Sequence, residues 1–97
     1  MLVKNLNGTG EKIPSCNCSS WLQHWNINKY PNKDYKAGYC RACKSRENLL
    51  GGHVIKKNST DRREYIVPIC SACNNVKDKE FEVDIKDLIY ANNCNEK

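Results

Sequence analysis

The strongest constraint in this sequence is a pair of Cys-x-x-Cys motifs. They are Cys40-Arg-Ala-Cys43 and Cys70-Ser-Ala-Cys73, and 26 residues separate them. Two residues between thiolates let both sulfurs face one ion, and two such pairs complete a closed tetrahedral zinc site. The alternatives are two redox-active pairs or buried thiols without a metal. We predict that Cys40, Cys43, Cys70 and Cys73 hold one structural zinc ion.

The composition explains why such a chain needs a metal. Its 97 residues make a single domain, and only 39% of them are apolar, so the core is small. No stretch approaches the ~20 apolar residues that span a bilayer, and residues 1–7 lack the apolar core of a signal peptide. We expect a cytoplasmic protein without a membrane partner, with an extended N-terminal segment over residues 1–15 and a single zinc-binding domain over residues 16–97.

Three further cysteines raise the question of a second metal. Cys16, Cys18 and Cys94, taken together with His24, form a second tetrahedral ligand set that would tie the two ends of the chain together. The alternatives are a disulfide from Cys94 to Cys16 or Cys18, free thiols, and a solvated His24. The sequence therefore predicts one zinc ion and leaves a second one open.

The apolar pattern around the motifs predicts short elements. Ser19 or Ser20 can cap a short helix that places Trp21, Leu22 and Trp25 on one face. Two β-rich segments flank the turn residues Asn-Ser-Thr-Asp61, which predicts a hairpin that runs into Cys70.

The segments after the hairpin are shorter. Residues 73–79 are polar enough for an exposed helix, and the alternation over residues 81–90 predicts a strand or turn that packs on the core. The expected fold class is a small zinc-stabilised α+β domain. Its centre is a ββα unit of treble-clef type, held by one metal and preceded by a short tryptophan-containing helix.

Several segments carry a family resemblance. Gly-Gly-His-Val, Tyr-Ile-Val-Pro-Ile-Cys and Cys-Ser-Ala-Cys-Asn, within residues 40–80, resemble the ββα-metal unit of HNH endonucleases. The flanks, over residues 14–94, resemble a group of small, poorly characterised HNH-like bacterial and viral proteins.

The resemblance implies catalytic roles for two residues. His53 takes the place of the general base, and Asn74 takes the place of a ligand to a catalytic magnesium or manganese ion. Two positions depart from the pattern: Gly52 stands where an acidic residue or histidine supplies a ligand, and Tyr65 stands where an asparagine is expected. Asp61 or Glu64 could repair the site. The alternative is that His53 is structural.

Charge favours a polyanion partner, and the alternative is a solvated charged face. The formal charge is +5, and residues 1–77 hold 13 Lys or Arg against 5 Asp or Glu. We expect phosphate contacts from a cluster on the hairpin, extended by basic residues of the first motif. The cluster is Lys56, Lys57, Arg62 and Arg63, and the extension is Arg41, Lys44 and Arg46.

The aromatic residues have two interpretations. They could stack on bases of a single strand, or they could form the core, which a chain with one Phe favours. They are Trp21, Trp25, Tyr30, Tyr35 and Tyr39.

The resulting hypothesis is a zinc-binding HNH-like protein that binds DNA or another nucleic acid and nicks DNA if its partly degenerate site is active. The alternative is a non-catalytic zinc module that binds a protein partner as a regulator or inhibitor.

Overall fold

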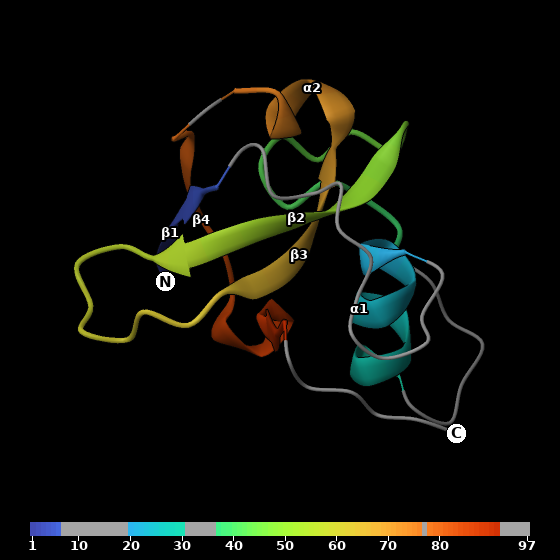
Figure 1. Ribbon diagram of the computed structural model, residues 1–97. Coiled ribbons are helices and arrows are strands. Elements are labelled where there is room, and N and C mark those ends of the chain that lie inside the picture. Colours follow the sequence, from blue (N-terminus) through green and yellow to red (C-terminus); the bar gives the residue numbers. More distant parts are fainter. Residues whose placement is uncertain (7–19, 31–36, 77, 92–97) are drawn as a thin grey trace.

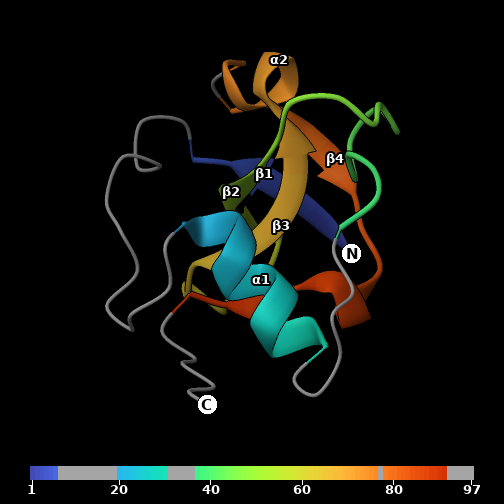
Figure 2. The same cartoon turned by 90° about the vertical axis from the view of Figure 1, so that its right-hand side faces the viewer.

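One antiparallel sheet organises the computed structural model, which describes residues 1–6, 20–30, 37–76 and 78–91 (Figure 1). The strand order is β4-β1-β2-β3-β5. The strands are β1 (Leu2–Asn5), β2 (Leu49–Lys56), β3 (Tyr65–Cys70), β4 (Glu80–Glu82) and β5 (Ile89–Tyr90). Helix α1 (Trp21–Lys29) covers one face, and the short helix α2 (Ser71–Asn74) continues from the end of β3 (Figure 2). Within these ranges no helix is long and apolar enough to cross a membrane.

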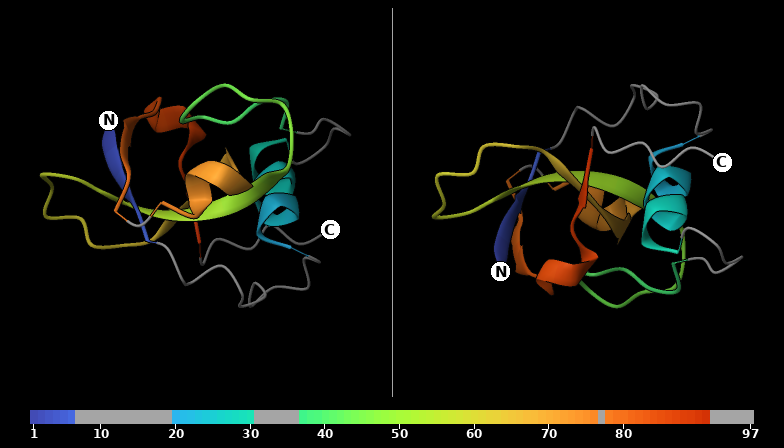
Figure 3. Two further views of the ribbon diagram at one scale, coloured as in Figure 1. Left: turned by 90° about the horizontal axis from the view of Figure 1, so that it is seen from above. Right: turned by 90° about the horizontal axis from the view of Figure 1, so that it is seen from below.

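The predicted hairpin is confirmed as the centre of the sheet. Strands β2 and β3 pair antiparallel, with Gly51 opposite Pro68 and His53 opposite Ile66. All six residues of β3 are buried, because strands lie on both of its edges and helix α1 covers it. The hairpin loop and helix α1 lie at opposite ends of the molecule (Figure 3).

The N-terminal segment contributes more than an extended lead-in. Leu2–Asn5 form β1, which pairs with β2 on one side and with β4 on the other. Val3 is fully buried in the main apolar cluster, opposite Phe81 of β4. The structure therefore places the first strand inside the sheet, while residues 7–15 lie outside the described part of the chain.

Helix α1 begins where the sequence predicts. The hydroxyl of Ser20 accepts a hydrogen bond from the backbone N–H of Gln23 at 3.1 Å, which caps the first turn. Trp25 is fully buried, and its indole N–H donates to the backbone oxygen of Asp87 at 2.8 Å. The core interpretation is confirmed for Trp25, whereas Tyr39 is 40% exposed and Tyr35 lies outside the described residues.

The predicted exposed helix over residues 73–79 is wrong. Helix α2 starts earlier, at Ser71, and ends at Asn74 after a single turn. Asparagine side chains compete with helical hydrogen bonding, and two of them follow Cys73 directly. The side-chain amide of Asn5 also donates hydrogen bonds to the backbone oxygens of Asn74 and Val76. These oxygens would otherwise be free to accept the hydrogen bonds of a longer helix. The chain then turns back into β4 as an edge strand.

Two adjacent glycines let elements approach β2 from both faces. A Cβ atom at Gly51 would lie 2.5 Å from the backbone carbon of Trp21 and 2.7 Å from the backbone nitrogen of Leu22. A Cβ atom at Gly52 would meet the side chain of Ile69, and would lie 3.5 Å from Oδ1 of Asn74. Helix α1 therefore lies against one face at Gly51, and α2 lies near the other face at Gly52.

We predict that Gly51→Ala lowers the melting temperature more than Gly52→Ala. The new methyl group at position 51 meets backbone, so α1 has to shift, and overpacking of this kind costs roughly 1–3 kcal/mol. At position 52 the methyl group meets Cδ1 and Cγ1 of the buried Ile69 side chain, which can shift at a lower cost than the backbone of a helix. Thermal denaturation followed by circular dichroism measures both variants, and equal losses would contradict the packing of α1 on Gly51.

Candidate metal centre

The four predicted ligands come together at the junction of β3 and α2. The sulfur atoms of Cys40, Cys43, Cys70 and Cys73 all lie within 4.8 Å of one another. The sulfurs of Cys43 and Cys70 are 3.7 Å apart, close to the ~3.8 Å edge of a tetrahedron with 2.3 Å zinc–sulfur bonds. This cluster could hold one structural metal ion such as zinc.

Local hydrogen bonds explain how the first motif reaches the second. The backbone N–H of Lys44 donates to the oxygen of Cys40 at 2.8 Å, and Lys44 adopts a positive φ of 69°, so the chain turns sharply after Cys43. The N–H of Arg41 donates to the oxygen of Pro68 at 2.9 Å. That bond docks the turn on β3, two residues before Cys70.

The thiols differ in how readily they ionise. Burial by itself would raise the pKa of Cys40, but hydrogen bonds from the backbone N–H groups of Cys43, Cys70 and Ala42 lower this pKa to about 7. Burial raises the pKa of Cys73 to about 12, and hydrogen bonds with the sulfurs of Cys70 and Cys43 add to the rise. Four clustered thiols cannot all become thiolates without a cation to compensate their charge, which a divalent metal would do.

Asn5 of β1 holds the helix that carries Cys73. Its side-chain amide is fully buried and donates to the backbone oxygens of Asn74 at 3.0 Å and Val76 at 3.1 Å. The two bonds fix the end of α2 against the sheet. Sequence reasoning missed this residue, because nothing in a polar asparagine near the N-terminus signals a contact nearly seventy residues away.

Arg41 links the first motif to the other layer of the fold. Its guanidinium donates to Asp87 at 2.9 Å and lies over the rings of Trp25 and Tyr39, at 5.2 and 4.1 Å from their centres. Lys29 of α1 also pairs with Asp87, at 3.2 Å. Burial opposes ionisation of Asp87, but the bonds from Arg41 and Lys29 hold its pKa below the usual value. Arg41 is thus engaged inside the protein and does not extend a phosphate-binding surface.

The structure does not bring His53 and Asn74 together. Alternation along β2 points neighbouring side chains to opposite faces, and Asn74 lies beside Gly52. His53 is 4% exposed and packs edge-on against Trp21, with ring centres 4.5 Å apart, on the face covered by α1. The residue pair implied by the HNH resemblance is therefore split between two faces of the sheet.

Asp61 does not repair that site. Its carboxylate accepts the hydroxyl of Tyr65 at 2.6 Å and pairs with Lys56 and Arg63, each at 3.1 Å. The hydrogen bonds from Arg63 and Tyr65 push the pKa of Asp61 far below its usual value. Asp61 therefore serves as the centre of a network at the hairpin loop.

Three of the four cations of the basic hairpin cluster form ion pairs within the protein. Lys56 and Arg63 share Asp61, and Lys57 pairs with Glu80 of β4. Among the described residues, Arg62 has no carboxylate within ion-pair distance.

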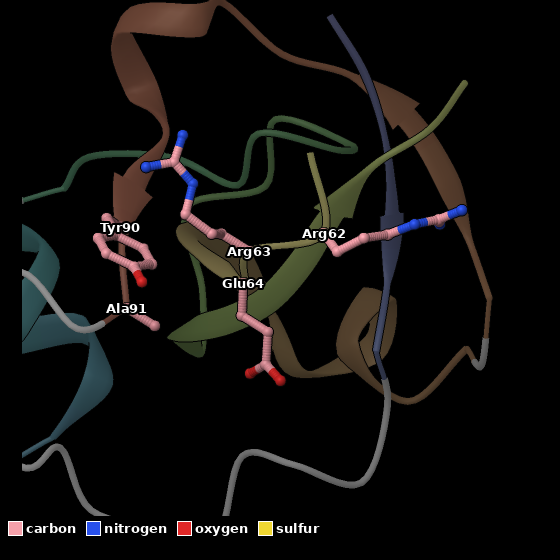
Figure 4. Close-up of a pocket in the computed structure, with 5 residues that line it drawn as sticks. All are labelled: Arg62, Arg63, Glu64, Tyr90 and Ala91. Atoms are coloured by element: carbon pink, nitrogen blue, oxygen red, sulfur yellow. The ribbon is translucent and has the colours of Figure 1, made fainter. Parts of the chain in front are cut away.

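A shallow pocket of about 250 Å³ lies beside this cluster (Figure 4). Arg62, Arg63, Glu64, Tyr90 and Ala91 line it. Arg62 points away from Tyr90, while Arg63 lies over the Tyr90 ring, 5.2 Å from its centre. The charged groups lining the pocket therefore do not converge on one point.

The second predicted metal set falls mostly outside the described part of the chain. This applies to Cys16, Cys18 and Cys94. His24 is described and fully buried, so the alternative of a solvated His24 is wrong. Its Nε2 lies 3.2 Å from the backbone oxygen of Tyr90. The second zinc ion stays a prediction.

Comparison with known proteins adds no relative. No protein-family model, curated protein or solved structure matches the chain. The function is therefore inferred from the geometry of the four-cysteine centre.

We predict that removal of the metal unfolds the domain. Zinc binding supplies ~10–16 kcal/mol in small zinc folds, as much as the whole stability of a typical domain. Cys73→Ser should unfold like the chelated wild type, whereas Arg46→Ala, an exposed change in the same loop, should not. Circular dichroism and zinc content measure both. A metal-free protein with the melting curve of the zinc-loaded form would contradict a structural metal.

Proposed function

We propose that this chain is a non-catalytic, zinc-stabilised binding module. The observation that carries the proposal is the gathering of four cysteine sulfurs within 4.8 Å. Four protein ligands fill the coordination sphere of zinc and leave no position for a water or a substrate, which is the arrangement of structural sites. The zinc ion would fix the turn at Cys40–Cys43 against β3 and α2.

The placement of His53 supports the absence of catalysis. A general base has to reach a water or substrate, and His53 is buried under Trp21 instead. Asn74, the other residue implied by the HNH resemblance, lies on the opposite side of β2. A catalytic magnesium or manganese ion at Asn74 would therefore not have His53 beside it as a base.

The partner we favour is another protein. Three large apolar side chains are exposed among the described residues, namely Tyr39, Val76 and Ile85 at 40%, 48% and 60%. They offer apolar contacts on the loops around the metal site and on the 3₁₀ turn Ile85–Asp87. A module of this kind would regulate or inhibit the protein that it binds.

We predict that the protein does not nick DNA. Supercoiled plasmid incubated with the zinc-loaded protein and either magnesium or manganese should stay supercoiled on agarose gels, while a known nicking enzyme converts it. Open-circle product that disappears in both His53→Ala and Asn74→Ala would contradict the proposal. Open-circle product that persists in both variants would indicate a contaminating nuclease.

Nucleic-acid binding is the second candidate, favoured by exposed cations without a carboxylate partner. Among the described residues of the hairpin and the first motif these are Arg62, Lys44 and Arg46. The aromatic residues of α1 lie at the opposite end of the molecule from the hairpin loop, so bases and phosphates would not meet one continuous surface there (Figure 1).

We predict that any DNA binding at the hairpin has a shallow salt dependence. Each phosphate contact adds about −0.9 to the log–log slope, so Arg62 alone gives about −0.9 and four free cations give about −3.6. Arg62→Gln should abolish the binding, whereas Lys57→Gln, which removes a cation already paired with Glu80, should leave it nearly unchanged. Fluorescence anisotropy with a short duplex measures the slope. A slope near −3.6 would restore the hairpin as a nucleic-acid surface.

A further inference from the structure

The four ligands of the metal centre differ in their access to solvent. Cys40, Cys70 and Cys73 are 0%, 5% and 7% exposed, and they belong to the main apolar cluster. Cys43 is exposed. A small reagent in solution would therefore reach the residue Cys43 before the other three cysteines.

The ligands also differ in the hydrogen bonds that their sulfurs accept. The Cys40 sulfur accepts backbone N–H groups of Ala42 at 3.3 Å and Cys43 at 3.4 Å. Within the described residues no backbone N–H donates to the sulfurs of Cys43, Cys70 and Cys73, so hydrogen bonding distinguishes Cys43 from Cys40, and exposure distinguishes it from the other two. Hydrogen bonds to a thiolate withdraw electron density from it, so the Cys43 sulfur keeps more of its nucleophilic character when bound to zinc.

The sulfur of Cys70 lies beside the sulfur of Cys43. Cys70 Sγ is 3.7 Å away, and a disulfide needs about 2.05 Å. Cys43 belongs to a turn without regular secondary structure, while Cys70 is the last residue of the buried strand β3. Cys43, in the exposed turn, can therefore move toward Cys70, which the buried strand holds in place.

We propose that Cys43 is the oxidation-sensitive ligand of the centre, and that hydrogen peroxide converts Cys43 and Cys70 into a disulfide that releases zinc. The inference rests on the proposed zinc binding. In the first step the Cys43 thiolate attacks one peroxide oxygen, the O–O bond breaks, and hydroxide leaves and takes a proton from solvent. The sulfur is now a sulfenic acid.

The second step closes the disulfide. The Cys70 thiolate attacks the Cys43 sulfur, the S–S bond forms, and the S–O bond breaks with loss of a second hydroxide, which also becomes water. Two thiolates have lost two electrons and the peroxide has gained them. Cys40 and Cys73 are then the only thiolates left at the centre, which is too few for four-coordinate zinc.

The oxidised form would keep part of the fold in place. The disulfide would still join the turn to the end of β3, as the metal did. Helix α2 would lose its metal bond through Cys73 and depend on the two hydrogen bonds from Asn5. The loss should therefore be local to α2 and reversible by a thiol reductant.

The experiment uses the full chain loaded with zinc and treated with hydrogen peroxide. A chromogenic zinc chelator follows release, and non-reducing peptide mapping by mass spectrometry identifies the disulfide. We expect loss of the zinc ion together with a Cys43–Cys70 cross-link. Cys43→His, which keeps a ligand that peroxide does not convert to a disulfide, should retain its zinc. Cys73→His is the matched control, because it retains Cys43 and should still lose the metal.

The outcomes separate the two proposals. A wild type that holds no zinc before oxidation would overturn the zinc-binding function. A zinc-loaded wild type that resists peroxide, or that releases zinc with Cys43 absent from every cross-link, would overturn the role of Cys43 alone. If either histidine variant fails to take up zinc, the test rests on the wild type. A Cys43–Cys70 disulfide in the peptide map then supports the role of Cys43, and its absence overturns that role.

Discussion

The close approach of four cysteine sulfurs is the constraint on which the rest of this structure depends. Cys40, Cys70 and Cys73 belong to the same buried cluster as Val3, Val67 and Ile69, so the four-cysteine site is part of the apolar core. In a chain with few apolar residues this matters, because burial alone contributes little against the entropy of ordering the chain. Thiols in such a place would repel one another once ionised. A divalent cation would convert that cost into the main tie between the turn at Cys40–Cys43, strand β3 and helix α2.

Two polar contacts support this tie from distant parts of the chain. Asn5 binds the end of α2 from the first strand, and Asp87 binds Arg41 from the last turn before β5. Both contacts are buried or nearly so, where a hydrogen bond is costly to lose because neither group regains water. The metal ligands are therefore held in position by side chains that do not bind the metal.

Whether the sequence predicted a feature of the structure depends on how far apart along the chain the interacting residues are. The ligand spacing, the cap at Ser20 and the hairpin are local, and each was predictable from residues a few positions apart. The place of β1, the amide of Asn5 and the Arg41–Asp87 pair depend on contacts between residues 46 to 80 positions apart, for which the pattern holds no signal. The ion pairs of the basic cluster escaped the sequence analysis for a related reason. Counting cations along the hairpin does not show that Asp61 and Glu80 already form ion pairs with three of them.

The glycine at position 52 shows how packing can imitate a degenerate active site. By resemblance to HNH endonucleases, Gly52 looks like a lost acidic ligand beside a surviving base. In the fold a Cβ atom at this position would run into Ile69, which is itself fully buried, so there is no room for a carboxylate unless the core moves. Its neighbour Gly51 is required because the backbone of α1 lies against it, and the same helix places Trp21 over His53. Among the residues that carry the HNH resemblance, Gly51 thus has a packing role, because it lets α1 lie close to the sheet.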